Sequence, residues 1–125
     1  MKTTFSKTER LKSKQLIDKL FYDGKSVSQF PLKLIYLKTE FNDGSVLKTG
    51  VSVSKRLFKN AVDRNRIKRL LREAFRLNKA EYFNNSSTSY AFMILYISND
   101  GATFEVINEN MKRLLNKFKE KTSEV

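Results

Sequence analysis

Residues 90–97 restrict the fold of this chain more than any other segment. They read Tyr-Ala-Phe-Met-Ile-Leu-Tyr-Ile, which is apolar at every position and rich in β-forming residues. A strand with one face in water alternates apolar and polar residues, whereas an unbroken apolar run is typical of a strand buried on both faces. We therefore expect a central strand in a sheet that other elements cover on both sides.

The rest of the chain supplies the elements that such a strand needs. Helices are expected at about 13–22, 61–80 and 103–119, and strands near 26–27 and at 32–38, 46–54 and 90–97. Turn residues at 41–45 predict that the strands at 32–38 and 46–54 form an antiparallel hairpin. The predicted fold is an α+β two-layer sandwich in the order αβββαβα, formed by residues 1–125 as one domain.

Composition narrows the classes of function. The net charge is +12, so the chain is a polycation for which nucleic acid is the leading partner. With no Cys and no His, it lacks thiol nucleophiles, the usual zinc ligands and the usual proton shuttle.

No run has the roughly 20 apolar residues of a membrane span, and the N-terminus has no apolar signal segment. We expect a cytoplasmic protein with no membrane partner.

The expected helix at 61–80 has one apolar side and one basic side. Residues 55–76 contain nine of the 25 basic residues and two acidic ones, so seven of the twelve net charges lie there. On a wheel of about 100° per residue, one side carries Ile67, Leu70, Leu71, Ala74 and Phe75, and the other carries Asn65, Lys68, Arg69, Arg72 and Arg76. Since acidic partners are scarce, a phosphate-binding face is favoured over an ordinary solvated one.

A motif of basic residues begins just before this helix and continues along it. It reads Val53-Ser54-Lys55-Arg56, then Arg64-Asn65-Arg66, Lys68-Arg69 and Arg72-Glu73. The motif closely resembles the signature of the bacterial ribonuclease P protein family, and the resemblance extends over nearly the whole chain. It implies a fold like a ribosomal-protein domain, with a left-handed strand–helix–strand crossover. Most such crossovers are right-handed. The RNA-binding positions it implies are Lys55, Arg56, Arg64, Asn65, Arg66, Lys68, Arg69 and Arg72, to which the wheel adds Arg76.

The resemblance also implies a division of labour. In such a complex, ribonuclease P RNA removes the 5′ leader of precursor tRNA with Mg²⁺ that the RNA mainly holds, while the protein positions the substrate. We therefore expect no catalytic residue and no metal ligand in this chain. We also expect no protein partner for it. A general RNA-binding or ribosome-associated protein is the alternative that the charge pattern alone permits.

A groove for the leader is implied as well, between the first helix and the open face of the sheet. On the helix Phe21 offers a ring on which a base can stack, although a core position is equally open. On the sheet, alternation puts Ile35 and Tyr36 on opposite faces, and we favour Tyr36 for the groove. The basic residues near its entrance bind the leader backbone or belong to a solvated N-terminus. The candidate residues are Arg10, Lys12, Ile17, Phe21 and Tyr36.

Two other classes of function fit the sequence less well. A nuclease acting through its own metal site would depend on acidic residues, for which the candidates are Asp43, Asp100, Glu105 and Glu109. The first two lie in Asn-Asp-Gly turns and the others on a helix rich in Lys and Arg, so turn formation and surface pairing explain them. A membrane-surface helix would need an aromatic rim beside its basic face, which the sequence lacks.

Overall fold

The strand that follows residue 89 lies inside a four-stranded sheet. The computed structural model describes residues 10–83 and 88–122. Its strands are β1 (Lys25–Gln29), β2 (Leu32–Lys38), β3 (Leu47–Val53) and β4 (Tyr90–Tyr96). β4 pairs antiparallel with β2 and parallel with β3, and β1 pairs with β2, which gives the order β1-β2-β4-β3. Side chains of β4 are buried on both faces, so its predicted central position is confirmed.

The predicted hairpin between the second and third strands is wrong, because β4 separates β2 from β3. The turn itself is present: the amide of Gly44 donates to the carbonyl of Phe41, and Gly44 has a φ of 79° that favours glycine. The connection from β2 to β3 then skips the position in the sheet that β4 occupies. β4 is apolar on both faces and gains more by pairing on both edges than at the rim of the sheet.

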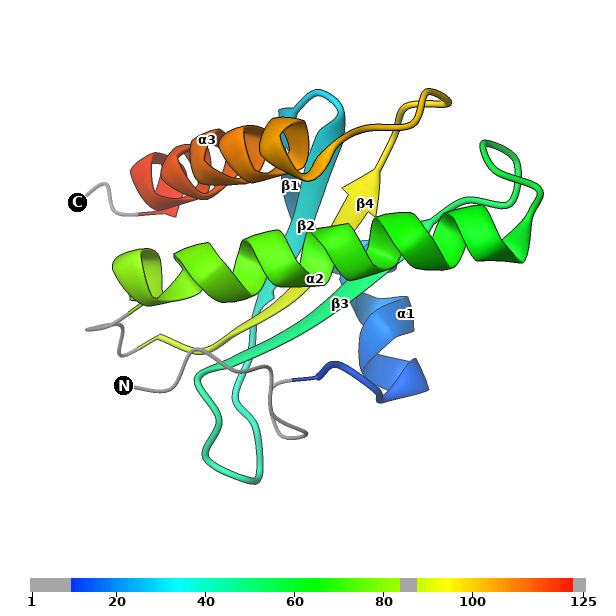
Figure 1. Ribbon diagram of the computed structural model, residues 1–125. Coiled ribbons are helices and arrows are strands. Elements are labelled where there is room, and N and C mark those ends of the chain that lie inside the picture. The colour runs from blue at the N-terminus through cyan, green and yellow to red at the C-terminus, as the bar shows by residue number, and fades with distance from the viewer. Residues whose placement is uncertain (1–9, 84–87, 123–125) are drawn as a thin grey trace.

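Three helices surround the sheet, α1 (Lys14–Asp23), α2 (Ala61–Phe83) and α3 (Phe104–Thr122), which completes the predicted order. Ser13 caps α1 by accepting a hydrogen bond from the amide of Leu16 at 3.2 Å. Gly24 ends the helix, and a Cβ there would clash with the carbonyl oxygen of Leu20. The two long helices, α2 and α3, lie together on one face of the sheet (Figure 1).

The connection β3-α2-β4 is a crossover between two parallel neighbours. In Figure 1, α2 passes in front of the sheet, and β4 lies to the left of β3 when the strands are turned to point upward. This arrangement is the left-handed one, as predicted, and differs from most strand–helix–strand connections.

Two apolar clusters hold the layers together. The larger lies between the sheet and the α2–α3 layer and contains the ring of Phe92 packed edge-on against Phe118, 4.8 Å between centroids. The smaller lies on the opposite face, where Leu11 and Leu20 pack on Ala91 and Met93. Each face of β4 is therefore packed against a different apolar cluster. Among the helices of the described ranges, none has both the length and the hydropathy needed to cross a membrane.

Candidate nucleic-acid interface

Burial of one side of α2 fixes which residues the other side presents. Asn60 begins the helix, since its side-chain oxygen accepts from the amide of Val62 at 3.0 Å. The residues of the predicted apolar side that are fully buried are Ile67, Leu71, Ala74 and Phe75, and Leu70 is partly buried against the same core. Because these residues are packed against the sheet, the helix cannot rotate, and its opposite side remains in solvent.

The exposed side of α2 carries cations that its own chain does not neutralise. Arg66, Arg69 and Arg72 are exposed and Lys68 is half-buried. None of these four forms an ion pair with a residue in 10–83 or 88–122. Asn65 is exposed beside them. Arg66, Arg69 and Arg72 follow one another at intervals of three residues, with Lys68 beside them, and the four form a surface suited to phosphates.

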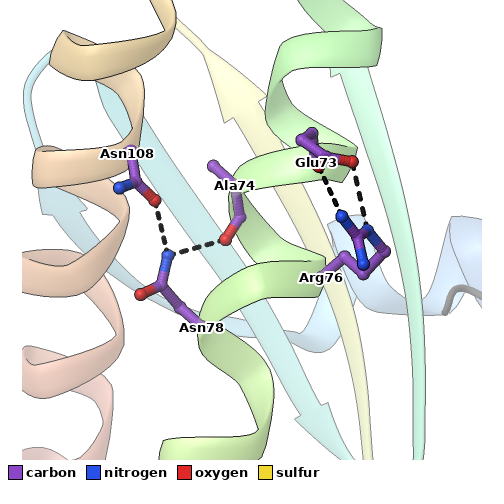
Figure 2. Close-up of polar contacts among 5 residues, drawn as sticks. All are labelled: Glu73, Ala74, Arg76, Asn78 and Asn108. Carbon is purple, nitrogen blue, oxygen red and sulfur yellow. Dashed lines mark hydrogen bonds and ion pairs between the residues drawn. The ribbon is translucent and has the colours of Figure 1, made fainter. Parts of the chain in front are cut away.

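Arg76 differs from these cations because it is already paired. Its guanidinium donates to both carboxylate oxygens of Glu73, with 3.1 Å between Nε and Oε1, as Figure 2 shows. The hydrogen bond from Arg76 lowers the pKa of the Glu73 carboxyl, and the same bond raises the pKa of Arg76. Of the predicted RNA-binding residues, Arg76 therefore offers the least uncompensated charge.

Arg64 supports the loop that leads into α2. Its Nη1 atom donates to the carbonyl of Phe58 at 2.8 Å and to that of Lys59 at 2.9 Å. The same loop holds Lys55 and Arg56, both exposed, at the carboxyl end of β3. Arg64 thus orders the basic loop in addition to any contact that it makes with RNA, a role that the sequence pattern did not reveal.

A groove lies beside α2, between α1 and the sheet. It has a volume of about 260 Å³, and its lining includes Arg10, Lys12 and Ile17 from the predicted groove and Arg72 from the predicted RNA-binding face. Gly50 also lines it, and a Cβ there would lie 3.0 Å from the Cε atom of Met93. Gly50 was not among the predicted groove residues, although a glycine within a strand is a signal of close approach.

The other two groove candidates lie elsewhere. Phe21 is 49% exposed on α1 and is not part of the lining. Placing Tyr36 in the groove is wrong: it is 5% exposed and packs against Phe118 of α3, on the face opposite α1. Tyr36 shares its side of β2 with Leu32 and Leu34, which belong to the main core, whereas Ile35 belongs to the cluster beneath α1. Of the two sheet positions considered, Ile35 is the one that faces the α1 side.

This arrangement suits binding by charge and shape. The described residues contain no group of three or more Asp or Glu side chains placed to hold a metal ion. An anchored basic helix, an ordered basic loop and a neighbouring groove with further cations are features of proteins that bind nucleic acid. The fold and the site together define a small α+β nucleic-acid-binding protein.

Comparison with known proteins gives the family. A family model described as Ribonuclease P matches residues 5–119. A Ribonuclease P protein component from Clostridioides difficile is 34% identical over 111 residues, which are 89% of this chain and 92% of that protein. Another, from Porphyromonas gingivalis, is 43% identical over 74 residues, but the match spans 54% of its length and 59% of this chain. The chain belongs to the ribonuclease P protein family.

A solved structure supports the same fold. The Staphylococcus aureus RNase P protein superposes with a TM-score of 0.69 at 25% sequence identity. The match covers 89% of this chain and 95% of that one. The likeness therefore extends over the whole sandwich and is not limited to the motif on α2.

Proposed function

We propose that this chain is the protein subunit of a ribonuclease P ribonucleoprotein and that it binds the RNA subunit through α2 and the loop before it. The observation that carries the proposal is the family match over residues 5–119, which includes the unpaired cations of α2. Four cations with no acidic partner in residues 10–83 or 88–122 repel one another in the free protein, and RNA phosphates relieve that repulsion on binding.

The groove beside α2 is proposed to bind the 5′ leader of precursor tRNA. Arg10 and Lys12 would contact its backbone, and Ile17 offers apolar surface to a base. Arg72 supports this assignment, because it projects from the basic helix and also lines the groove. A single arginine thus brings the RNA-binding surface and the substrate groove next to each other.

Cleavage of the leader is proposed to take place on the RNA, in the cytoplasm, with Mg²⁺ that the RNA mainly holds. The chain has no His and no Cys. A surface of Lys and Arg lowers the electrostatic cost of bringing two polyanions together, and this is how the protein would assist the reaction. It would thereby reduce the Mg²⁺ concentration at which RNA and substrate associate.

Reconstitution tests this proposal. The purified chain is mixed with a bacterial ribonuclease P RNA at low Mg²⁺, and release of the leader from precursor tRNA is measured. We expect cleavage to be faster with the chain than with the RNA alone, and absent with the chain alone. Cleavage by the chain alone, or no stimulation at all, would contradict the proposal. Equal binding to unrelated RNAs without stimulation would favour a general RNA-binding protein.

A further inference from the structure

A cavity of about 510 Å³ opens at the end of the sheet where β2 ends and β4 begins. The residues that give it its chemistry are Asp23, Lys25, Tyr36, Lys38, Tyr90 and Lys121. They come from the last turns of α1 and α3 and from strands β1, β2 and β4. Because β3 runs parallel to β4 and Leu47 pairs with Tyr90, this is the end of the sheet opposite the basic loop that follows β3.

Two tyrosines, Tyr36 and Tyr90, line this cavity. The ring of Tyr36 is buried against Phe118, 4.9 Å between centroids, and against Tyr90 at 6.2 Å. Neither the Tyr36 nor the Tyr90 hydroxyl forms a hydrogen bond with a residue of the described ranges. By contrast, the hydroxyl of Tyr96 in the same core donates to the carbonyl of Asp100 at 2.6 Å. The Tyr36 oxygen is not among the fully buried polar atoms, so solvent reaches it and it can donate to a ligand in the cavity that Tyr36 lines.

The hydroxyl of Tyr36 is a hydrogen-bond donor at neutral pH. Burial of the side chain raises its pKa, and the neighbouring Tyr90 raises it further. The proton therefore stays on the oxygen, and the group can donate to an acceptor that carries negative charge.

Cations outnumber acids around the two hydroxyls. Lys25, Lys38 and Lys121 are exposed, and none forms an ion pair within the described part of the chain. In the described lining, Asp23 is the one acidic side chain. The carboxyl end of α3 adds a partial negative charge, which Lys121 in its last turn offsets. Ammonium and phenol groups that line one cavity suit an oxyanion with several acceptor oxygens.

We propose that this cavity binds a phosphate group, held by Lys25, Lys38 and Lys121 with the hydroxyl of Tyr36 as a further donor. Its volume admits a phosphate together with its nucleoside. The phosphate belongs to an RNA strand, which rests on the proposed function, or to a free phosphate ester. In the first case the protein contacts RNA at both ends of its sheet.

Two pairs of variants test the site in the full-length chain. Tyr36→Phe removes the hydroxyl and keeps the ring that packs on Phe118, and Tyr22→Phe removes an exposed hydroxyl from α1 as its control. Lys38→Gln/Lys121→Gln removes two charges from the cavity. Its control, Lys112→Gln/Lys119→Gln, removes two charges from α3 outside the cavity. Melting curves confirm that each variant folds.

The first arm uses adenosine monophosphate and inorganic phosphate as probes, followed by amide shifts in NMR spectra. We expect shifts at residues 23–25, 36–38 and 121–122, and binding several-fold weaker in Tyr36→Phe and in the cavity pair than in their controls. The second arm measures affinity for ribonuclease P RNA and for precursor tRNA against salt. If RNA supplies the phosphate, the cavity pair should flatten the log–log slope by about 0.7 to 0.9 per lost contact, beyond any change in its control.

The outcomes separate the two proposals. Probe binding without a difference in RNA affinity supports the phosphate site and assigns it to a free phosphate ester. If cavity variants and controls behave alike in both arms, the site is overturned, even when the wild-type chain stimulates cleavage. If the wild-type chain fails to stimulate cleavage but phosphate binding still depends on Tyr36, the proposed function falls and the phosphate site remains.

Discussion

The basic residues on α2 differ in what they contact within the protein. Arg69 is exposed and has no ion pair among the described residues, Arg76 is paired with Glu73, and Arg64 donates to two loop carbonyls. Binding driven by counterion release depends on how many phosphates the protein neutralises. Cations without an internal partner should therefore contribute more to RNA binding than a count of basic residues indicates.

Arg69→Ala should weaken binding to ribonuclease P RNA and flatten the slope of log affinity against log salt by about 0.7 to 0.9, the value for one lost phosphate contact. Arg76→Ala should flatten the slope less, because Glu73 already neutralises much of its charge. Filter binding at several salt concentrations measures both slopes. Equal slopes for the wild type and Arg69→Ala would remove Arg69 from the interface.

Glu73→Gln should have the opposite effect. The substitution keeps the side-chain shape but removes the carboxylate that Arg76 contacts, so Arg76 becomes available to phosphate. We expect tighter RNA binding and a steeper salt slope, measured in the same assay. Glu109→Gln, on α3, makes the same change in net charge away from α2 and serves as the control. An equal gain in both variants would mean that net charge alone is responsible.

Phe21→Leu should test whether the leader reaches the exposed ring of Phe21, which lies on α1 outside the groove lining, and stacks a base on it. With 49% of its surface exposed, Phe21 contributes less packing than the fully buried Leu20 beside it. We expect little change in melting temperature and a loss of about 1 to 3 kcal/mol in binding to precursor tRNA, but not to mature tRNA. A matched loss for both tRNAs, or a large fall in melting temperature, would count against stacking.

At the scale of elements, a polar contact joins the two long helices. The side-chain amide of Asn78 on α2 donates to the carbonyl of Ala74 and to the side-chain oxygen of Asn108 on α3, each at 2.7 Å (Figure 2). Asn78 is 5% exposed, so this contact lies within the packed layer. It adds a directional contact between α2 and α3 to the apolar packing that orients α2.

Asn78→Ala should lower the free energy of unfolding by about 1 to 3 kcal/mol, because it leaves the Asn108 side chain without its buried donor. The double variant Asn78→Leu/Asn108→Leu should be closer to the wild type, since it removes both polar partners together. Urea unfolding of the single and double variants gives the coupling between the two sites. Strictly additive losses would show that the two side chains do not act as a pair.

The limits of what the sequence predicts are also clearest at the scale of elements. Helix and strand positions follow from periodicity and caps, and Ser13 and Gly24 do end α1 as expected. Strand pairing does not follow, because the turn at Gly44 shows only that the chain reverses. Which strand lies next to β2 depends on where the doubly buried β4 is inserted, and that is a contact distant in sequence.

The site was predictable to a similar extent. The apolar side of α2 determined its basic side, so the exposure of Arg69 and Arg72 agrees with the wheel. Predicting the groove residues required the face of β2 on which each residue lies. A shift of one residue in the strand exchanges Ile35 with Tyr36. The contacts of Arg64 with loop carbonyls do not follow from the pattern of charges. The partner of Arg76 does lie within sequence reach, because Glu73 is three residues away on the same helix.

At the scale of the whole molecule, the net charge of +12 opposes folding when no anions are bound. Seven of these charges lie in residues 55–76, and most of the cations there are exposed on one layer of the sandwich. Packing of α2 against the sheet forces them together, whereas an unfolded chain would separate them. Anions that bind the native surface should therefore stabilise this protein more than one of balanced charge.

Sulfate should raise the melting temperature more than sodium chloride at the same ionic strength. Screening acts equally in both salts, but only sulfate can accept several hydrogen bonds from neighbouring cations, and a ligand at 100 times its Kd stabilises by about 2.7 kcal/mol. The variant Arg69→Ala/Arg72→Ala has fewer cations on α2, so its added response to sulfate should be smaller while its melting temperature without sulfate should be unchanged or higher. Thermal unfolding followed by circular dichroism in matched salts measures both effects. If sulfate and chloride act alike on the wild type, screening explains the whole response and the cations on α2 do not form an anion site.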